Sequence, residues 1–114
     1  MENPRVSGEI KITEQAIEEL AAYTAMQSYG VIGMAVSSWR ARLIKFLGTI
    51  GPDQGVKVEY ADGGVKIDLF IIVEHGTNIR EVAKNLTDQI TYTVNKQTKL
   101  DVKDVEVHVS KIKT

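Results

Sequence analysis

The chain of 114 residues has no cysteine, and it contains only one tryptophan, two histidines and two prolines. The lack of cysteine excludes disulfides, thiolate metal sites and cysteine nucleophiles, and it fits a reducing compartment. The stretch MENPRVSGEIKIT has no apolar signal core, and no apolar run approaches the roughly 18–20 residues that span a bilayer. We therefore expect a cytoplasmic protein without a membrane span, which comes near a membrane only through a partner.

Neither sign of charge predominates, because 14 basic residues nearly balance 15 acidic ones. A net charge of −1 gives no global electrostatic case for nucleic acid, so no DNA partner is expected. Gly30-Val31-Ile32-Gly33 has the GxxG spacing of KH domains, but apolar residues stand where such loops normally carry basic ones. Trp39 with Arg40, Arg42 and Lys45 forms a small basic patch, which leaves a weak nucleic-acid-binding module as a second alternative.

The strongest pattern present is a β-hairpin between Gly55 and Gly76, with the sequence GVKVEYADGGVKIDLFIIVEHG. Asp62-Gly63 is a favoured pair for a two-residue turn, because both positions tolerate positive φ. With this turn, Glu59 faces Lys66 and Lys57 faces Asp68, whereas a one-residue slip would turn the apolar side chains to the wrong face. The residues predicted to face the core are Val56, Val58, Tyr60, Val65, Ile67, Leu69, Ile71 and Val73.

The opposite face of the hairpin begins with charged side chains and then becomes apolar at Phe70 and Ile72. A sheet face exposed to water should stay polar throughout, so these two residues indicate a cover. The cover is either another part of the same chain or a second protein molecule. An apolar patch of this kind is a candidate interface.

The remaining segments predict a single α+β domain over residues 1–114, with helices packed on a mainly antiparallel sheet and a loose start at residues 1–7. Thr13 and Asn78 are expected N-caps, and Glu81 completes a capping box. The predicted order is strand Gly8–Ile12, helix from Thr13 to about Ser28, strand Val31–Val36, helix Trp39–Leu47, the hairpin, helix from Asn78 to about Gln97, and strand Val102–Val109.

Catalytic residues are hard to find in this sequence. The two histidines, His75 and His108, have Glu74 and Glu106 close to them in the chain. If the last strand lies beside the hairpin, these four residues could form a cluster that binds a divalent metal or transfers protons. No metal-ligand spacing such as HxxxH is present, so exposed strand residues are the preferred interpretation. We expect no enzyme activity, no catalytic residues, no metal site and no cofactor.

Protein–protein interaction is therefore the leading hypothesis. The candidate interface residues are Phe70, Ile72, Trp39, Arg40 and Arg42. The helix Trp39–Leu47 has an aromatic, apolar side and a cationic side, so it could also lie in a membrane interface, although packing on the sheet is preferred. A small-ligand pocket between helix and sheet is a further alternative, for which no specific polar set is visible.

Two blocks of the sequence resemble the alkaline shock protein family, the Gls-type stress proteins of Gram-positive bacteria. GEIKIT before a helix and then GVIGMAV resembles the opening of that family. IDLFIIVEHGTNIREVAKNL, a long helix and TKLDVKDVEVHVSKI resembles its most recognisable part. The departures are Arg80, where many members have proline, and Glu106, where many have asparagine. The likeness is to the short, tail-less type.

This resemblance implies a non-enzymatic, cytosolic protein of the envelope stress response. It further implies self-association into homo-oligomers and association with a membrane-anchored relative of the family. The resemblance to short members leaves an alternative function, which is an accessory or regulatory role beside a dihydroxyacetone-kinase-like fatty acid kinase.

Overall fold

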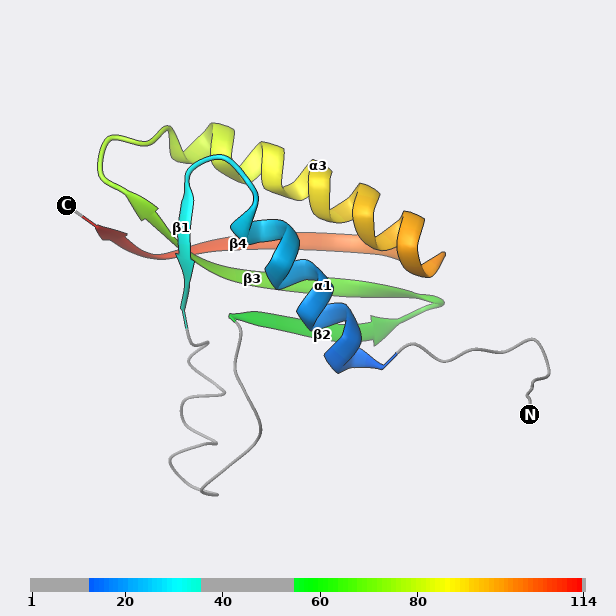
Figure 1. The fold of residues 1–114 in the computed structure, drawn as a ribbon. Helices are drawn as coiled ribbons and strands as arrows, with labels where there is room; N and C mark the ends of the chain where they lie inside the picture. The colour runs from blue at the N-terminus through cyan, green and yellow to red at the C-terminus, as the bar shows by residue number, and fades with distance from the viewer. Residues whose placement is uncertain (1–12, 36–54, 114) are drawn as a thin grey trace, which may run out of the picture.

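The computed structural model describes residues 13–35 and 55–113. These residues form two helices and four strands in one α+β arrangement (Figure 1). In chain order they are α1 (Glu14–Met26), β1 (Val31–Met34), β2 (Val56–Ala61), β3 (Gly64–Glu74), α3 (Ile79–Thr98) and β4 (Asp101–Lys113). The predicted fold class is confirmed. The predicted strand Gly8–Ile12 and helix Trp39–Leu47 lie outside the described residues.

The hairpin of β2 and β3 has the predicted turn and the predicted register. Asp62 and Gly63 both take positive φ angles, of 47° and 82°. Glu59 is the register partner of Lys66. Because the side-chain period of a strand is two residues, this register places one apolar set on a single face of the sheet.

Strand β3 is the centre of the sheet. Its first part pairs antiparallel with β2 and its last part antiparallel with β1, while β4 runs parallel to it along its whole length. β1 and β2 therefore lie end to end along one edge of β3, and β4 lies along the other. Between β1 and β2, Ala35 N donates to Phe70 O and Phe70 N donates to Gly55 O, both at 2.8 Å. Near Phe70, therefore, β3 has neighbouring chain along both of its edges.

Both helices begin at the predicted caps. Ala16 N donates to Thr13 Oγ1 at 3.1 Å, and Glu81 N donates to Asn78 Oδ1 at 3.2 Å. Each contact satisfies a backbone donor that has no partner within the helix. Helix α1 ends at Met26, slightly before the predicted Ser28, and α3 ends at Thr98 with Lys99 in the left-handed conformation.

The core lies between the two helices and one face of the sheet. Seven of the eight predicted core positions of the hairpin are buried, and Val82, Leu86, Ile90 and Val94 of α3 complete the stripe that covers them. Tyr60 is the exception, since 43% of it is exposed. It lies at the end of β2, where desolvation and the carboxylate of Glu14 raise the pKa of its hydroxyl above the ordinary value. The prediction for Tyr60 was wrong because the strand continues past the helical cover.

Candidate functional site

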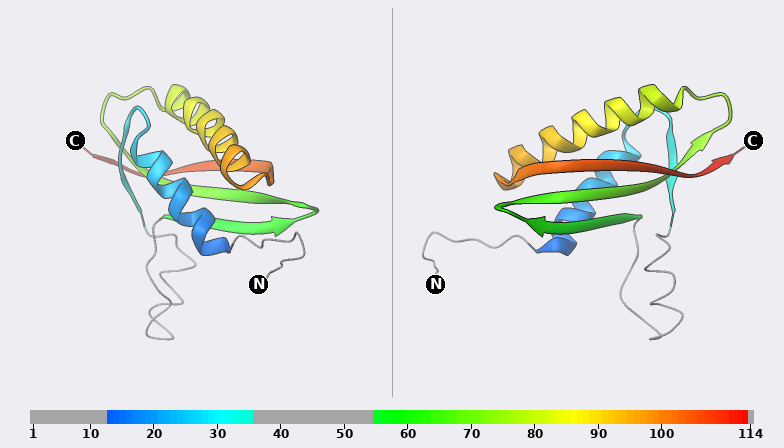
Figure 2. Two further views of the ribbon diagram at one scale, coloured as in Figure 1. Left: turned by 45° about the vertical axis from the view of Figure 1, so that its right-hand side comes forward. Right: turned by 180° about the vertical axis from the view of Figure 1, so that it is seen from behind.

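The face of the sheet that points away from the helices carries two of the predicted interface residues, Phe70 and Ile72. Figures 1 and 2 show α1 and α3 on the same side of the sheet. Phe70 and Ile72 alternate with buried residues of β3, so they lie on the other side and are half-buried. We call this surface the open face. It is defined by Lys66, Asp68, Phe70 and Ile72 of β3, their neighbours Lys57 and Glu59 on β2, and Asp104, Glu106 and His108 on β4.

Phe70 and Ile72 gain part of their shelter from neighbours within the sheet. The rings of Phe70 and His108 stack, with centroids 4.6 Å apart and an angle of 12° between their planes. Ile72 faces Gly33 of β1, where a Cβ atom would stand 3.5 Å from Ile72 Cδ1. Neighbouring strands on either side of β3 therefore supply part of the cover that the sequence predicts for Phe70 and Ile72.

A polar cluster lies next to the stacked rings. His108 Nε2 is 3.0 Å from Asp68 Oδ1 and 3.6 Å from Glu106 Oε1. Because an ionised carboxylate can only accept, the Nε2–H donates in the shorter contact. The side chains are 41% exposed for His108, 28% for Asp68 and 60% for Glu106, so the cluster opens to solvent.

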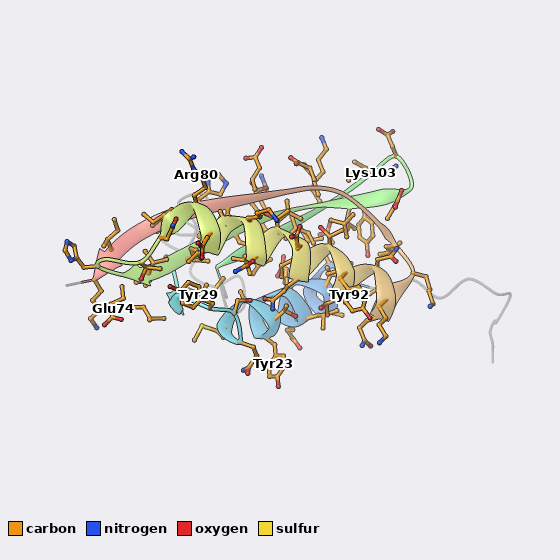
Figure 3. The ribbon with its side chains drawn as sticks, turned by 90° about the horizontal axis from the view of Figure 1, so that it is seen from above. Tyr23, Tyr29, Glu74, Arg80, Tyr92 and Lys103 are labelled. Carbon is orange, nitrogen blue, oxygen red and sulfur yellow. The ribbon has the colours of Figure 1, made fainter. Side chains whose placement is uncertain are left out.

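The four-residue cluster that the sequence offered as a less favoured alternative is only half assembled. Glu106 and His108 come together, but their acidic neighbour on β3 is Asp68, which sequence reasoning placed among the charged residues and did not connect to them. Glu74 pairs instead with Lys113, and the backbone N–H of His75 donates to Lys113 O at 2.7 Å. Glu74 thus lies at the end of β3 that is far from this cluster. Figure 3 shows Glu74 and Lys103 near opposite ends of the molecule. Because β4 pairs in parallel with β3 in this register, Glu106 and His108 lie beside Asp68 and Phe70 and not beside Glu74.

The remaining candidate interface residues, Trp39, Arg40 and Arg42, fall outside the described ranges. The GxxG stretch is not a backbone cradle, since β1 begins at Val31, which is buried. Gly30, with φ of 84°, lies so close to α3 that an added Cβ atom would clash with the side chain of Val82. In residues 13–35 and 55–113, no helix is long and apolar enough to cross a bilayer.

A hollow of about 350 Å³ lies between α1 and α3. Its lining is Thr24 and Gln27 of the first helical segment and Asp88, Gln89, Tyr92 and Thr93 of α3. Figure 3 shows Tyr92 on α3, on the side where α1 lies, and Tyr23 on α1. The small-ligand pocket considered from the sequence was expected between helix and sheet, so this hollow is in a different place.

Comparison with known proteins identifies the family. The model of the alkaline shock protein 23 family, described by its cell envelope-related function, matches residues 2–114. The chain belongs to the alkaline shock protein family. The resemblance seen in the two sequence blocks is confirmed, and this stress-response family has a cell envelope-related function.

Relatives of known source agree with this assignment. YloU of Bacillus subtilis (strain 168) is 34% identical over 107 residues, which are 93% of this chain and 89% of YloU. YqhY of the same strain is 28% identical over 102 residues, which are 90% of this chain and 75% of YqhY. A stress response regulator gls24 homolog of Streptococcus pyogenes serotype M3 is 25% identical over 109 residues, which are 96% of this chain and 61% of that protein. None of these relatives has an enzymatic name.

Solved structures show a similar fold. A variant of the MamM CTD covers 87% of this chain and 98% of its own, with a TM-score of 0.53 and 12% identity. Another variant of the same domain gives a TM-score of 0.52, also at 12% identity. The likeness is one of fold alone.

Proposed function

We propose that this member of the alkaline shock protein family is a non-enzymatic scaffold that acts by self-association, and that two copies meet through their open faces. The observation that carries this proposal is the position of Phe70 and Ile72. They lie at the middle of the sheet on the side that α1 and α3 leave uncovered. Burying the exposed part of two large apolar side chains favours contact between copies.

The charges on the open face suit a second copy of the same chain. Lys57 and Lys66 lie among Glu59, Asp68 and Glu106, so the surface carries both signs. A twofold arrangement with antiparallel β3 strands places the apolar pair of one copy near that of the other and the charged rows at the rim. The net charge of −1 adds little repulsion between copies.

The size of the face sets the expected strength. Eleven residues of β3 span about 36 Å and three strands span about 14 Å, which gives a flat area of about 500 Å². Stable interfaces bury about 800 Å² on each partner. We therefore expect reversible association that depends on concentration. We further propose that the assembly reaches the envelope through a membrane-anchored partner, in keeping with the family's cell envelope-related function.

The test is sedimentation velocity over a wide range of concentrations, comparing the wild-type chain with Phe70→Asp and Ile72→Lys. The matched control is Tyr23→Asp, which places the same charge on an exposed aromatic residue of α1 on the other side of the molecule. We expect both open-face variants to be folded monomers while the control associates like the wild type. A wild-type chain that stays monomeric at high concentration would overturn the proposal, and so would association that Phe70→Asp leaves intact.

A further inference from the structure

We infer that Asp68, Glu106 and His108 form a binding site for one divalent transition-metal ion on the open face. Each residue offers one ligand atom, and these atoms lie within 4.8 Å of one another. A carboxylate–carboxylate–imidazole set suits ions such as Zn²⁺ and Mn²⁺, which accept both oxygen and nitrogen ligands.

The spacing of the ligand atoms supports this site. Zn²⁺ binds oxygen and nitrogen at about 2.0–2.2 Å, so neighbouring ligands around a tetrahedral ion lie about 3.3 Å apart. The separations from His108 Nε2 are 3.0 Å to Asp68 Oδ1 and 3.6 Å to Glu106 Oε1. The side chain of Glu106 is 60% exposed, so it has room to turn its carboxylate towards the ion. Solvent reaches the remaining coordination positions.

The backbone and the neighbouring ring hold two of the ligands in place. Asp68 and Glu106 are register partners on the parallel strands β3 and β4, and His108 lies two residues further along β4. Stacking on Phe70 fixes the plane of the His108 ring with Nε2 directed at the carboxylates. An imidazole already oriented towards its co-ligands loses little freedom when a metal replaces the proton on Nε2.

The charges give a second, independent reason. Asp68 and Glu106 are like charges on neighbouring strands, an arrangement that is destabilising unless a positive charge lies between them. Lys57 faces Asp68 from the other side, on β2. A bound divalent cation would place positive charge between the two carboxylates, and it binds Nε2 when the ring proton sits on Nδ1.

Calorimetric titration with ZnCl₂ and with MnCl₂, on protein without a polyhistidine tag, tests the site. We expect one ion per chain, with affinity lowered at least about tenfold by His108→Ala and by Asp68→Asn, because even residues outside the ligand shell contribute that much. Glu106→Gln should lower it less. The control is His75→Ala, which removes the other histidine at the exposed end of β3 and should leave the affinity unchanged.

A spectroscopic readout separates this site from adventitious binding. Mn²⁺ should broaden the imidazole proton resonances of His108 strongly and those of His75 much less. Absence of saturable binding would overturn the inference, and so would binding that survives Asp68→Asn or that is lost equally in His75→Ala. Repeating the titration on Ile72→Lys, which keeps all three ligands, shows whether the site depends on the association proposed above. Binding by that variant stands even if self-association fails.

Discussion

The two faces of β3 have opposite surroundings although they belong to the same eleven residues. Val65, Ile67, Leu69, Ile71 and Val73 point towards the helices and are almost completely buried. Lys66, Asp68, Phe70 and Ile72 point the other way, where charged and apolar side chains lie together and keep contact with solvent. The contrast shows that one strand supplies both the centre of the core and the surface that we propose for binding. Substitutions at neighbouring positions of β3 should therefore affect either stability or the proposed binding, and not both equally.

The largest effect should come from the adjacent pair Ile71 and Ile72. Ile71→Ala removes a fully buried side chain and should lower the free energy of unfolding by about 2–5 kcal/mol. Ile72→Ala should lower it by about 1 kcal/mol or less, because the side chain is half-buried and its contacts are lateral. Urea unfolding of both variants measures the difference. Equal losses would mean that the open face is covered in solution as fully as the helical face.

A smaller effect is expected at the start of the covering helix. Asn78→Ala removes the acceptor for Glu81 N and should destabilise the chain by about 1 kcal/mol, since the freed donor has no other partner in the helix. Asn78→Asp keeps an oxygen in the same place and should be nearly neutral. Thermal unfolding compares the two. If both variants lose the same amount, the contribution of the cap has been assigned wrongly.

The smallest effect should come from the charged rows of the open face. Glu59 and Lys66 are both exposed and face each other across the hairpin. A double-mutant cycle with Glu59→Ala and Lys66→Ala should give a coupling of about 0.2–1 kcal/mol, which falls as salt is added. No coupling, or coupling that salt does not change, would show that the register contributes through packing alone.

The sequence predicts the local features of both faces well. The turn at Asp62-Gly63, the alternation along β3 and the caps at Thr13 and Asn78 are all decided by residues close in the chain. The pairing of β3 with β4 is different, because it joins positions about forty residues apart across α3. No local signal sets its direction or register. For this reason the sequence offered a cluster of Glu106 and His108 with Glu74 and His75 only as a conditional alternative, whereas the structure places Glu106 and His108 beside Asp68.

The same limit explains the wrong placement of Tyr60. Its alternation with Val58 is that of a core residue, and only the position of α1 over the sheet leaves it exposed. Phe70 shows the reverse case. Its place on the polar side was visible in the sequence, but its stacking on His108 depends on the long-range strand pairing. The sequence therefore predicts which face of the sheet carries the candidate site, but it does not predict which side chains on that face touch one another.

The most direct test of the central claim is a dilution series followed by NMR of the isoleucine methyl groups. If copies meet through their open faces, the Cδ1 methyl resonance of Ile72 should shift with protein concentration. The methyl of Ile79, exposed at the start of α3, should stay constant, and so should that of buried Ile71. A concentration-dependent shift at Ile79 with none at Ile72 would contradict the account, because association would then take place on the helical side of the molecule.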